Sequence, residues 1–225
     1  MPIAAGTDNK PYVDADCLRS RRAHPELLAK TLGTPVDSEA CSGATTEDVL
    51  KIQLPAADLG PGTQLVTLTV GINNVGWQTL LTECLTDETS QACQAALAQV
   101  DLGIAGLPSE ITTVLEAIHD KAPRAQVVIT GYPEAFGEFS GSCNLGNFGK
   151  GQIRIDADQT HPFNALVTLV NMQIGAGVEA DNKDAAGRHL ATAGIDVNPS
   201  FEGHRLCDTG DRWISGLLPE NRSAV

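Results

Sequence analysis

Two short runs of consecutive apolar, mostly β-branched residues predict buried β-strands. They are residues 64–70 and Gln126–Thr130, and a turn precedes each of them. Consecutive rather than alternating apolar positions are typical of strands that are covered on both faces of a parallel sheet. Residues 194–197 form a weaker strand candidate, and residues 39–42 are interpreted as the end of another strand.

Helical patterns separate these runs. Apolar residues recur every three or four positions in residues 23–32, 109–119 and 165–174, and Ser109 is interpreted as the cap of the second helix. Alternation of strands with helices favours an α/β fold, specifically a three-layer α/β/α sandwich around a mostly parallel sheet. In such sheets the binding crevice forms at the carboxyl ends of the strands, so the residues after each strand are the functional candidates.

Composition narrows the classes of function. The chain has 225 residues, 42% of them hydrophobic, which suffices for one core, and we expect a single domain over residues 1–225. Its apolar stretches are much shorter than the roughly 20 residues of a membrane-spanning helix. The net charge of −13 disfavours nucleic acid as a partner, and the scattered acidic residues are typical of a solvated surface.

The six cysteines lack the spacing of a zinc site, and no Cys/His cluster is visible, so the sequence indicates neither a metal nor a cofactor. Disulfide bonds are the favoured interpretation, with six reduced thiols as the alternative. Sequential pairing is the simplest of several connectivities: Cys17–Cys41, Cys84–Cys93 and Cys143–Cys207. Disulfides imply an oxidising compartment, so we expect a secreted, extracellular protein. No signal peptide precedes Met1, which suggests a mature, engineered or truncated form.

Several segments together resemble a known family. Cys-Leu-Arg-Ser at 17–20, His-Pro-Glu-Leu-Leu at 24–28 and Ala-Cys-Ser-Gly-Ala-Thr-Thr at 40–46 resemble the opening third of secreted actinobacterial lipases of the SGNH (GDSL-type) hydrolase family. Residues 65–77 resemble the third sequence block of that family, and residues 131–133 and 201–207 resemble two further landmarks. The similarity spans residues 4 to about 218, and the six cysteines fit the three disulfides of the family.

The resemblance implies a flavodoxin-like α/β/α sandwich and a carboxylic ester hydrolase that forms an acyl-enzyme. Gly43 and Asn73 correspond to the two donors of the oxyanion hole. The alternative roles are a turn for Gly43 and a cap for Asn73. Asn74 replaces the aspartate that is usual in the family. The expected substrate is a small-molecule or lipid ester, without a cofactor, and the expected state is a monomer.

Two catalytic blocks of the family are not found in their places. Pro2 stands at the position of the catalytic serine, although Ala4-Ala5-Gly6 of the same block is retained. The strand that leads into this block is missing, and so is the Asp-x-x-His-Pro block that would follow residues 213–214. We therefore expect a domain truncated at both ends that lacks its first strand. Four or five buried aliphatic side chains of that strand would contribute roughly 6–15 kcal/mol, so the chain is expected to be marginally stable unless another segment or molecule fills the gap.

Other residues are candidates for the missing roles. Asp158 and His161 form an Asp-x-x-His-Pro pattern, but they precede a helix and a helix-start or surface motif explains them as well. His204 follows a strand end and is a candidate base or substrate-binding residue, with a structural histidine as the alternative. Ser42 is a candidate nucleophile or a hydroxyl that holds a turn. His24, His119 and His189 are interpreted as surface or core histidines.

The sequence leaves two hypotheses. The first is an SGNH-type ester hydrolase, and the second is a non-catalytic domain that retains the fold for ligand binding or interaction. A conventional α/β-hydrolase is excluded because no Gly-x-Ser-x-Gly elbow is present.

Overall fold

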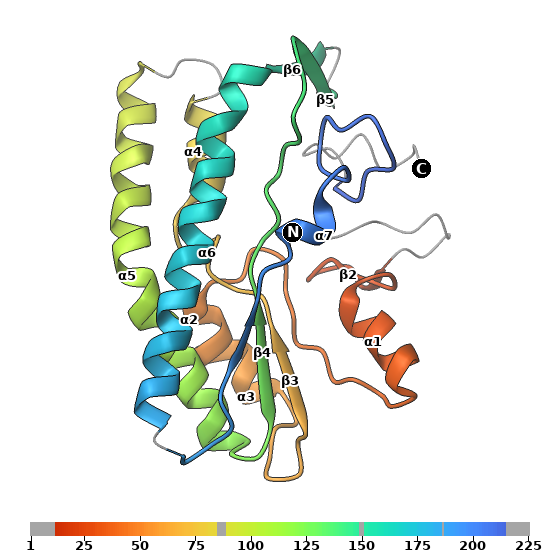
Figure 1. Ribbon diagram of the computed structural model, residues 1–225, viewed down its shortest axis with the longest axis vertical. Helices are drawn as coiled ribbons and strands as arrows, with labels where there is room; N and C mark the ends of the chain where they lie inside the picture. Colours follow the sequence, from red (N-terminus) through yellow and green to blue (C-terminus); the bar gives the residue numbers. More distant parts are fainter. Residues whose placement is uncertain (1–11, 85–88, 149–150, 186, 215–225) are drawn as a thin grey trace. The chain divides into compact units, whose positions relative to one another are not determined.

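The computed structural model describes residues 12–84, 89–148, 151–185 and 187–214, and these residues form an α/β fold with a parallel sheet (Figure 1). The sheet has the order β3-β4-β7, and both pairings are parallel. Its strands are β3 Leu65–Leu68, β4 Gln126–Thr130 and β7 Ala193–Ile195. The predicted fold class and the parallel sheet are therefore confirmed.

The central strand β4 carries the core of the sheet. Val127 and Ile129 are fully buried, and the alternate positions Gln126, Val128 and Thr130 are half-buried. Leu68 of β3 pairs with Ile129, and Thr130 pairs with Ile195 of β7, so the three strands end at the same edge. The segments that follow β3 and β4 consequently leave the sheet side by side. The expected absence of a first strand concerns the start of the chain, which lies outside the described residues.

Helix α5 is much longer than the sequence pattern predicted. It runs from Gln91 to Lys121, and the hydroxyl of its cap Ser90 accepts a hydrogen bond from the backbone N–H of Cys93 over 3.0 Å. The interpretation of Ser109 as a cap is wrong, because Ser109 lies inside this helix and directly follows Pro108. The upstream half buries small residues, such as Cys93 and Ala96, which give a weak apolar periodicity.

Helix α6, Ala157–Ala185, packs closely against α5. A Cβ atom added at Gly177 would lie 2.7 Å from Cβ of Ile111, closer than unbonded carbon atoms approach. The hydroxyl of Thr112 also lies 3.1 Å from the carbonyl oxygen of Gly177 and can donate to it. Gly177 therefore allows the backbones of the two helices to come into contact.

The chain divides into two compact units, and the division falls within α6. Unit 2 comprises residues 43–132 and 168–197 and contains the parallel sheet. Its further elements are α2 Thr46–Asp48, the π-helix η1 Val49–Gln53, α3 Leu54–Ala56 and α4 Trp77–Cys84. Unit 1 comprises the described parts of residues 1–42, 133–167 and 198–225. Its elements are β1 Tyr12–Asp14, β2 Arg19–Ser20, α1 His24–Leu32, β5 Ser142–Phe148, β6 Gly151–Asp156 and α7 Asn198–Phe201.

The three predicted disulfides are present. Cys17–Cys41 and Cys143–Cys207 lie in unit 1, and Cys84–Cys93 lies in unit 2. The expected strand end at residues 39–42 is wrong, because these residues form no strand. The disulfide at Cys41 and the hydrogen bond from Ser42 N–H to Cys17 O hold this segment in place of strand pairing.

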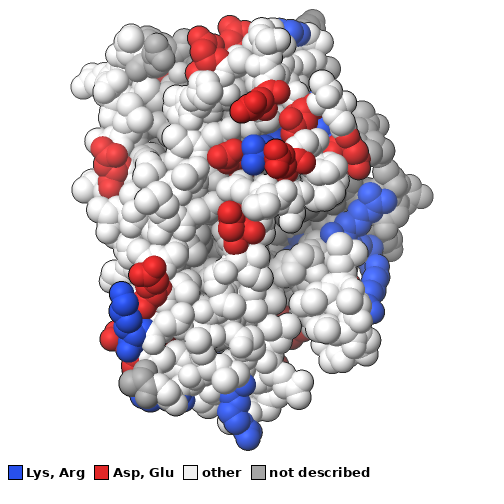
Figure 2. Space-filling model, in the orientation of Figure 1, with Lys and Arg blue, Asp and Glu red and all other residues white. Residues whose placement is uncertain are grey.

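Two surface expectations can be compared with the structure. Among the described residues, no helix combines the length and the apolar character that crossing a membrane requires. On the face drawn in Figure 2, acidic side chains are spread over several separate regions between uncharged residues. This distribution matches the solvated acidic surface that the sequence predicted.

Candidate functional site

The turn that precedes α2 carries the first candidate residue, Gly43. Its φ angle is +85°, in the left-handed region that favours glycine. Two residues later, Thr45 caps α2: its hydroxyl accepts from the backbone N–H of Asp48, and the Asp48 carboxylate accepts from the backbone N–H of Thr45 over 2.8 Å. This reciprocal capping box fixes the conformation of the turn immediately after Gly43 and Ala44.

Asn73 follows strand β3, and two hydrogen bonds orient its side chain. Its Nδ2 donates to the carbonyl oxygen of Ala44 over 2.8 Å, and its Oδ1 accepts from Nε1 of Trp77 over 3.1 Å. Neither of these bonds uses the second N–H of Nδ2. The amide of Asn73 therefore lies beside the residue that adjoins Gly43, with one donor left for a further acceptor.

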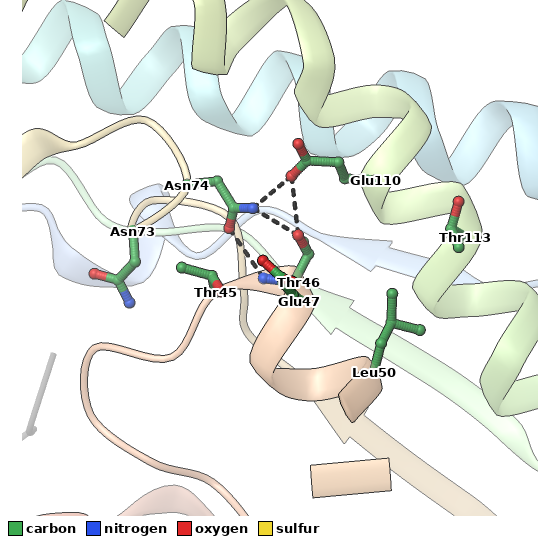
Figure 3. A pocket seen from close by; sticks show the side chains of 8 residues that line it. All are labelled: Thr45, Thr46, Glu47, Leu50, Asn73, Asn74, Glu110 and Thr113. Carbon is green, nitrogen blue, oxygen red and sulfur yellow. Dashed lines mark hydrogen bonds between the residues drawn. The ribbon is translucent and has the colours of Figure 1, made fainter. Parts of the chain in front are cut away.

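Asn74 points away from Asn73 and has a different task (Figure 3). Its Oδ1 accepts from the backbone N–H of Thr46 over 3.1 Å, and its Nδ2 donates to the hydroxyl of Thr46 over 2.6 Å and to Oε2 of Glu110. The Thr46 hydroxyl donates in turn to Glu110 over 2.9 Å. The amide thus ties the start of α2 to helix α5, and an aspartate here would place a second carboxylate against Glu110.

A hollow of about 370 Å³ lies beside this network. Figure 3 shows the side chains that line it. They are Thr45, Thr46, Glu47, Leu50, Asn73, Asn74, Glu110 and Thr113. Most of the lining comes from α2 and its flanking residues and from α5, so the network of Asn74 also forms one wall of the hollow.

Tyr132 lies at the carboxyl end of β4 and links the exits of two strands. Its hydroxyl accepts a long hydrogen bond of 3.4 Å from the backbone N–H of Ile72, which follows β3. Asn171 of α6 bonds both the N–H and the carbonyl of Tyr132, each over 2.8 Å. Burial raises the pKa of the Tyr132 phenol well above its usual range, which keeps it neutral. These contacts hold the edge of the sheet that carries Asn73.

The sequence analysis placed the candidate site at the carboxyl ends of the predicted strands, but it missed the side chains that hold this edge of the sheet. Trp77, Glu110 and Asn171 were not singled out. Trp77 belonged to the segment that resembles the third block, which is the only signal that pointed to it. Glu110 and Asn171 lie inside long helices, where no local pattern distinguishes them from other polar residues.

The candidates for a replacement nucleophile and base lie in unit 1. Ser42 is exposed in a turn. Asp158 and His161 lie in the first turns of α6, as the helix-start interpretation predicts, and no described contact pairs the two residues. Pro2 lies outside the described residues.

His204 lies in a loop after α7. Its Nδ1 lies 2.5 Å from the carbonyl oxygen of Asp211, and its ring stacks on Trp213 with 3.8 Å between the ring centres. Because a carbonyl oxygen only accepts, the hydrogen of neutral His204 is on Nδ1 and Nε2 carries the lone pair. That tautomer is the one a general base uses, and it equally suits a histidine held for structural reasons.

Comparisons with known proteins identify the family of this chain and its relatives. The model of the GDSL-like lipase/acylhydrolase family matches residues 3–206. A lipase of Streptomyces rimosus is 37% identical over 210 residues, which cover 92% of this chain and 70% of the relative. Lipase 1 of Streptomyces coelicolor is 34% identical over 218 residues, which cover 95% of this chain and 73% of the relative.

Two solved structures are similar over most of their length. The extracellular lipase of Streptomyces rimosus matches with a TM-score of 0.71 and 32% identity, over 97% of this chain and 86% of that one. Phospholipase A1 of Streptomyces albidoflavus matches with a TM-score of 0.67 and 31% identity, over 88% of this chain and 76% of that one. These findings favour the hydrolase hypothesis over the non-catalytic one. The chain belongs to the GDSL-like lipase/acylhydrolase family.

Proposed function

We propose that this chain is a carboxylic ester hydrolase whose oxyanion hole is formed by the backbone N–H of Gly43 and by Nδ2 of Asn73. The observation that carries the proposal is the orientation of the Asn73 amide. It is held from both ends, by Ala44 and by Trp77, and one N–H remains for a ligand. A donor fixed before the substrate arrives needs no reorganisation when charge develops.

The reaction follows from this placement. A serine hydroxyl attacks the ester carbonyl carbon, its proton passes to a base, and the carbonyl oxygen becomes an oxyanion. The two N–H groups stabilise that oxyanion until the alcohol leaves with a proton and an acyl-enzyme remains, which water then hydrolyses to the acid. Removal of one such donor typically costs about 2.7–4 kcal/mol of transition-state stabilisation. Pro2 has no nucleophilic side chain, so the labelling experiment below has to identify which serine attacks the ester.

The relatives support a substrate class and a location. They are named as lipases and as a phospholipase A1, so we take fatty acyl esters as the substrates. The three disulfides and the similarity to an extracellular lipase support action outside the cytoplasm. The family match covers parts of both units, which supports a single family domain rather than two independent ones.

The first experiment combines turnover and labelling. The folded protein is assayed with p-nitrophenyl butyrate and then treated with a fluorophosphonate probe, and mass spectrometry locates the labelled serine. We expect turnover that falls roughly 100- to 1,000-fold in Asn73→Ala. A label on Ser42 would identify that residue as the nucleophile. Loss of turnover in a His204→Gln variant that still folds would identify His204 as the base.

A second readout does not depend on turnover. Butyrate, the product, presents a carboxylate oxygen where the oxyanion forms, so titration with butyrate should shift the side-chain amide resonance of Asn73 in a ¹⁵N spectrum. Asn144, a distant asparagine in sequence that lies on β5, serves as the control resonance. A folded protein that neither hydrolyses the ester nor shows this shift would overturn the proposal.

A further inference from the structure

The hollow beside Asn73 lies within unit 2, between α5 and the short helices that follow Gly43. Its volume is about 370 Å³. One wall comes from Glu110 and Thr113, which are three residues apart on α5 and therefore lie on one face of that helix. Glu47 of α2 and Leu50 of η1 line it from the other side (Figure 3). Because Asn73 belongs both to the hollow and to the proposed oxyanion hole, the hollow adjoins the position of the ester carbonyl.

The side chains of Asn74 and Thr46 have no hydrogen left for a ligand in this hollow. One hydrogen of Asn74 Nδ2 is donated to the Thr46 hydroxyl over 2.6 Å, and the other is donated to Oε2 of Glu110. The Thr46 hydroxyl donates its single hydrogen to the same oxygen of Glu110 over 2.9 Å. Oε1 of Glu110 accepts no hydrogen bond from the described residues, so this carboxylate still offers an acceptor.

The other two threonines of the lining have also used their hydrogens. The hydroxyl of Thr45 donates to the carboxylate of Asp48 over 2.7 Å, and the hydroxyl of Thr113 donates to the carbonyl oxygen of Ser109 over 2.9 Å. A hydroxyl whose hydrogen is used still has a lone pair that can accept. Thr113 therefore adds an acceptor to the wall that α5 forms.

The carboxylate of Glu47 completes the set of acceptors. Its charge is offset by an ion pair with Lys51, four residues further along the chain. Among the described side chains that line the hollow, only Asn73 keeps a hydrogen that can be donated. A ligand group that fits here must therefore bring its own donors. A carboxylate or phosphate group in the hollow would meet Glu47 and Glu110 without a donor between them.

We propose that this hollow binds the alcohol portion of the ester and selects neutral alcohols that carry free hydroxyl groups, as a glycerol ester does. This inference rests on the ester-hydrolase function proposed above. The hydroxyl groups of glycerol donate to Thr113 and to the two carboxylates, while its carbon atoms pack against Leu50 and the methyl groups of the threonines. An acyl chain brings no donor, and it would take water from the carboxylates without replacing the lost hydrogen bonds.

Two butyrate esters test this selectivity. The alcohol portion of monobutyrin has two free hydroxyl groups, and that of ethyl butyrate has none. In Thr113→Val the ratio of kcat/KM for monobutyrin to kcat/KM for ethyl butyrate should fall roughly 2- to 13-fold, which is the effect of one lost hydrogen bond. Thr82→Val is the matched control, because Thr82 donates to a carbonyl oxygen of its own helix in the same way but does not line the hollow, so the ratio should not change.

A second pair of variants tests the opposite wall. Glu47→Ala removes an exposed carboxylate of the lining, and the same ratio should fall again. Glu116→Ala removes an exposed carboxylate of α5 that does not line the hollow, and the ratio should stay that of the unchanged protein.

A binding measurement separates this inference from the proposed ester hydrolysis. In a ¹³C spectrum of threonine methyl groups, titration with glycerol should shift the Thr113 resonance saturably and leave the Thr82 resonance in place. This shift in a protein without turnover would support the hollow as a site for hydroxyl groups and would contradict the hydrolase. Turnover with no shift at Thr113, and with an unchanged ratio in Thr113→Val, would overturn the inference and leave the hydrolase intact. Tighter binding of ethanolamine than of glycerol would overturn the selection of neutral alcohols.

Discussion

Trp77 donates a hydrogen bond from Nε1 to Oδ1 of Asn73 over 3.1 Å, from the first turn of the helix that follows the strand exit. This contact sets the rotation of the Asn73 amide, because the other end of the amide bonds to Ala44. A side chain that is not itself part of the proposed oxyanion hole thereby fixes the direction of one of its donors.

Trp77→Phe tests this positioning role. The aromatic ring is retained and only the N–H is lost, so Asn73 loses one of its two restraints. A hydrogen bond of this kind contributes about 0.5–1.5 kcal/mol, and we expect kcat for p-nitrophenyl butyrate to fall roughly 2- to 13-fold with little change in KM. A rise in KM at constant kcat would show that Trp77 contacts the substrate instead.

Asn74→Asp tests why this chain departs from the aspartate of its family. The new carboxylate would lie against Oε2 of Glu110, which Asn74 now contacts through Nδ2. We expect a loss of roughly 1–3 kcal/mol in the free energy of unfolding by urea. The double variant Asn74→Asp/Glu110→Gln restores a donor and should recover most of the loss. Equal stability of the single and double variants would show that the two side chains are not coupled.

Gly177→Ala tests the contact between α5 and α6. The added methyl group would lie 2.7 Å from Ile111, so the helices must separate, at a cost of about 1–3 kcal/mol in the free energy of unfolding. Gly175→Ala in the same helix is the matched control, because nothing lies within 4 Å of its added Cβ. There the better helix propensity of alanine should stabilise by about 0.5–1 kcal/mol. Thermal or urea unfolding of the two variants provides the comparison.

Asp48→Asn tests a pH dependence at the turn that follows Gly43. Hydrogen bonds from the backbone and the hydroxyl of Thr45 lower the pKa of Asp48. A carboxyl with a lowered pKa contributes stability above its unfolded pKa of about 4 and loses that contribution as the pH falls through the folded value. The asparagine side chain of the variant cannot titrate, so the variant should lose less stability below about pH 4 than the unchanged protein. The measurement is the free energy of unfolding by urea as a function of pH for both proteins. An equal loss of stability below about pH 4 in both would contradict this expectation.

The sequence predicted the strands of the parallel sheet better than the long helices, but it did not predict the antiparallel pairs β1–β2 and β5–β6. Both ends of β4 were predicted correctly, because four consecutive β-branched residues follow Gln126 and glycine comes directly after them. Helix α5 was predicted at a third of its length, since its first half buries mainly small residues such as alanine and cysteine and Ser109 was interpreted as a cap. The strand expected at residues 39–42 failed because a disulfide, which leaves no periodic pattern, holds that segment.

For the candidate site, the sequence indicated which residues are the oxyanion-hole candidates, and the structure showed which side chains hold them. Gly43 and Asn73 were found by resemblance, and the bond between Asn73 and Ala44 brings their segments together. The contact between Asn74 and Glu110 joins residues 36 positions apart, in a strand exit and a helix interior.

The disulfides are divided unequally between the two units, and thiol reductants should therefore affect them differently. Unit 1 holds the bridges that close 24 and 64 residues, whereas the bridge of unit 2 closes nine. Because a longer closed loop restricts the unfolded chain more, reduction of Cys17–Cys41 and Cys143–Cys207 removes more stability than reduction of Cys84–Cys93. The loop that Cys143–Cys207 closes runs through residues 168–197 of unit 2, so loss of this bridge would also lower the stability of the part of α6 and of the strand β7 that lie in unit 2.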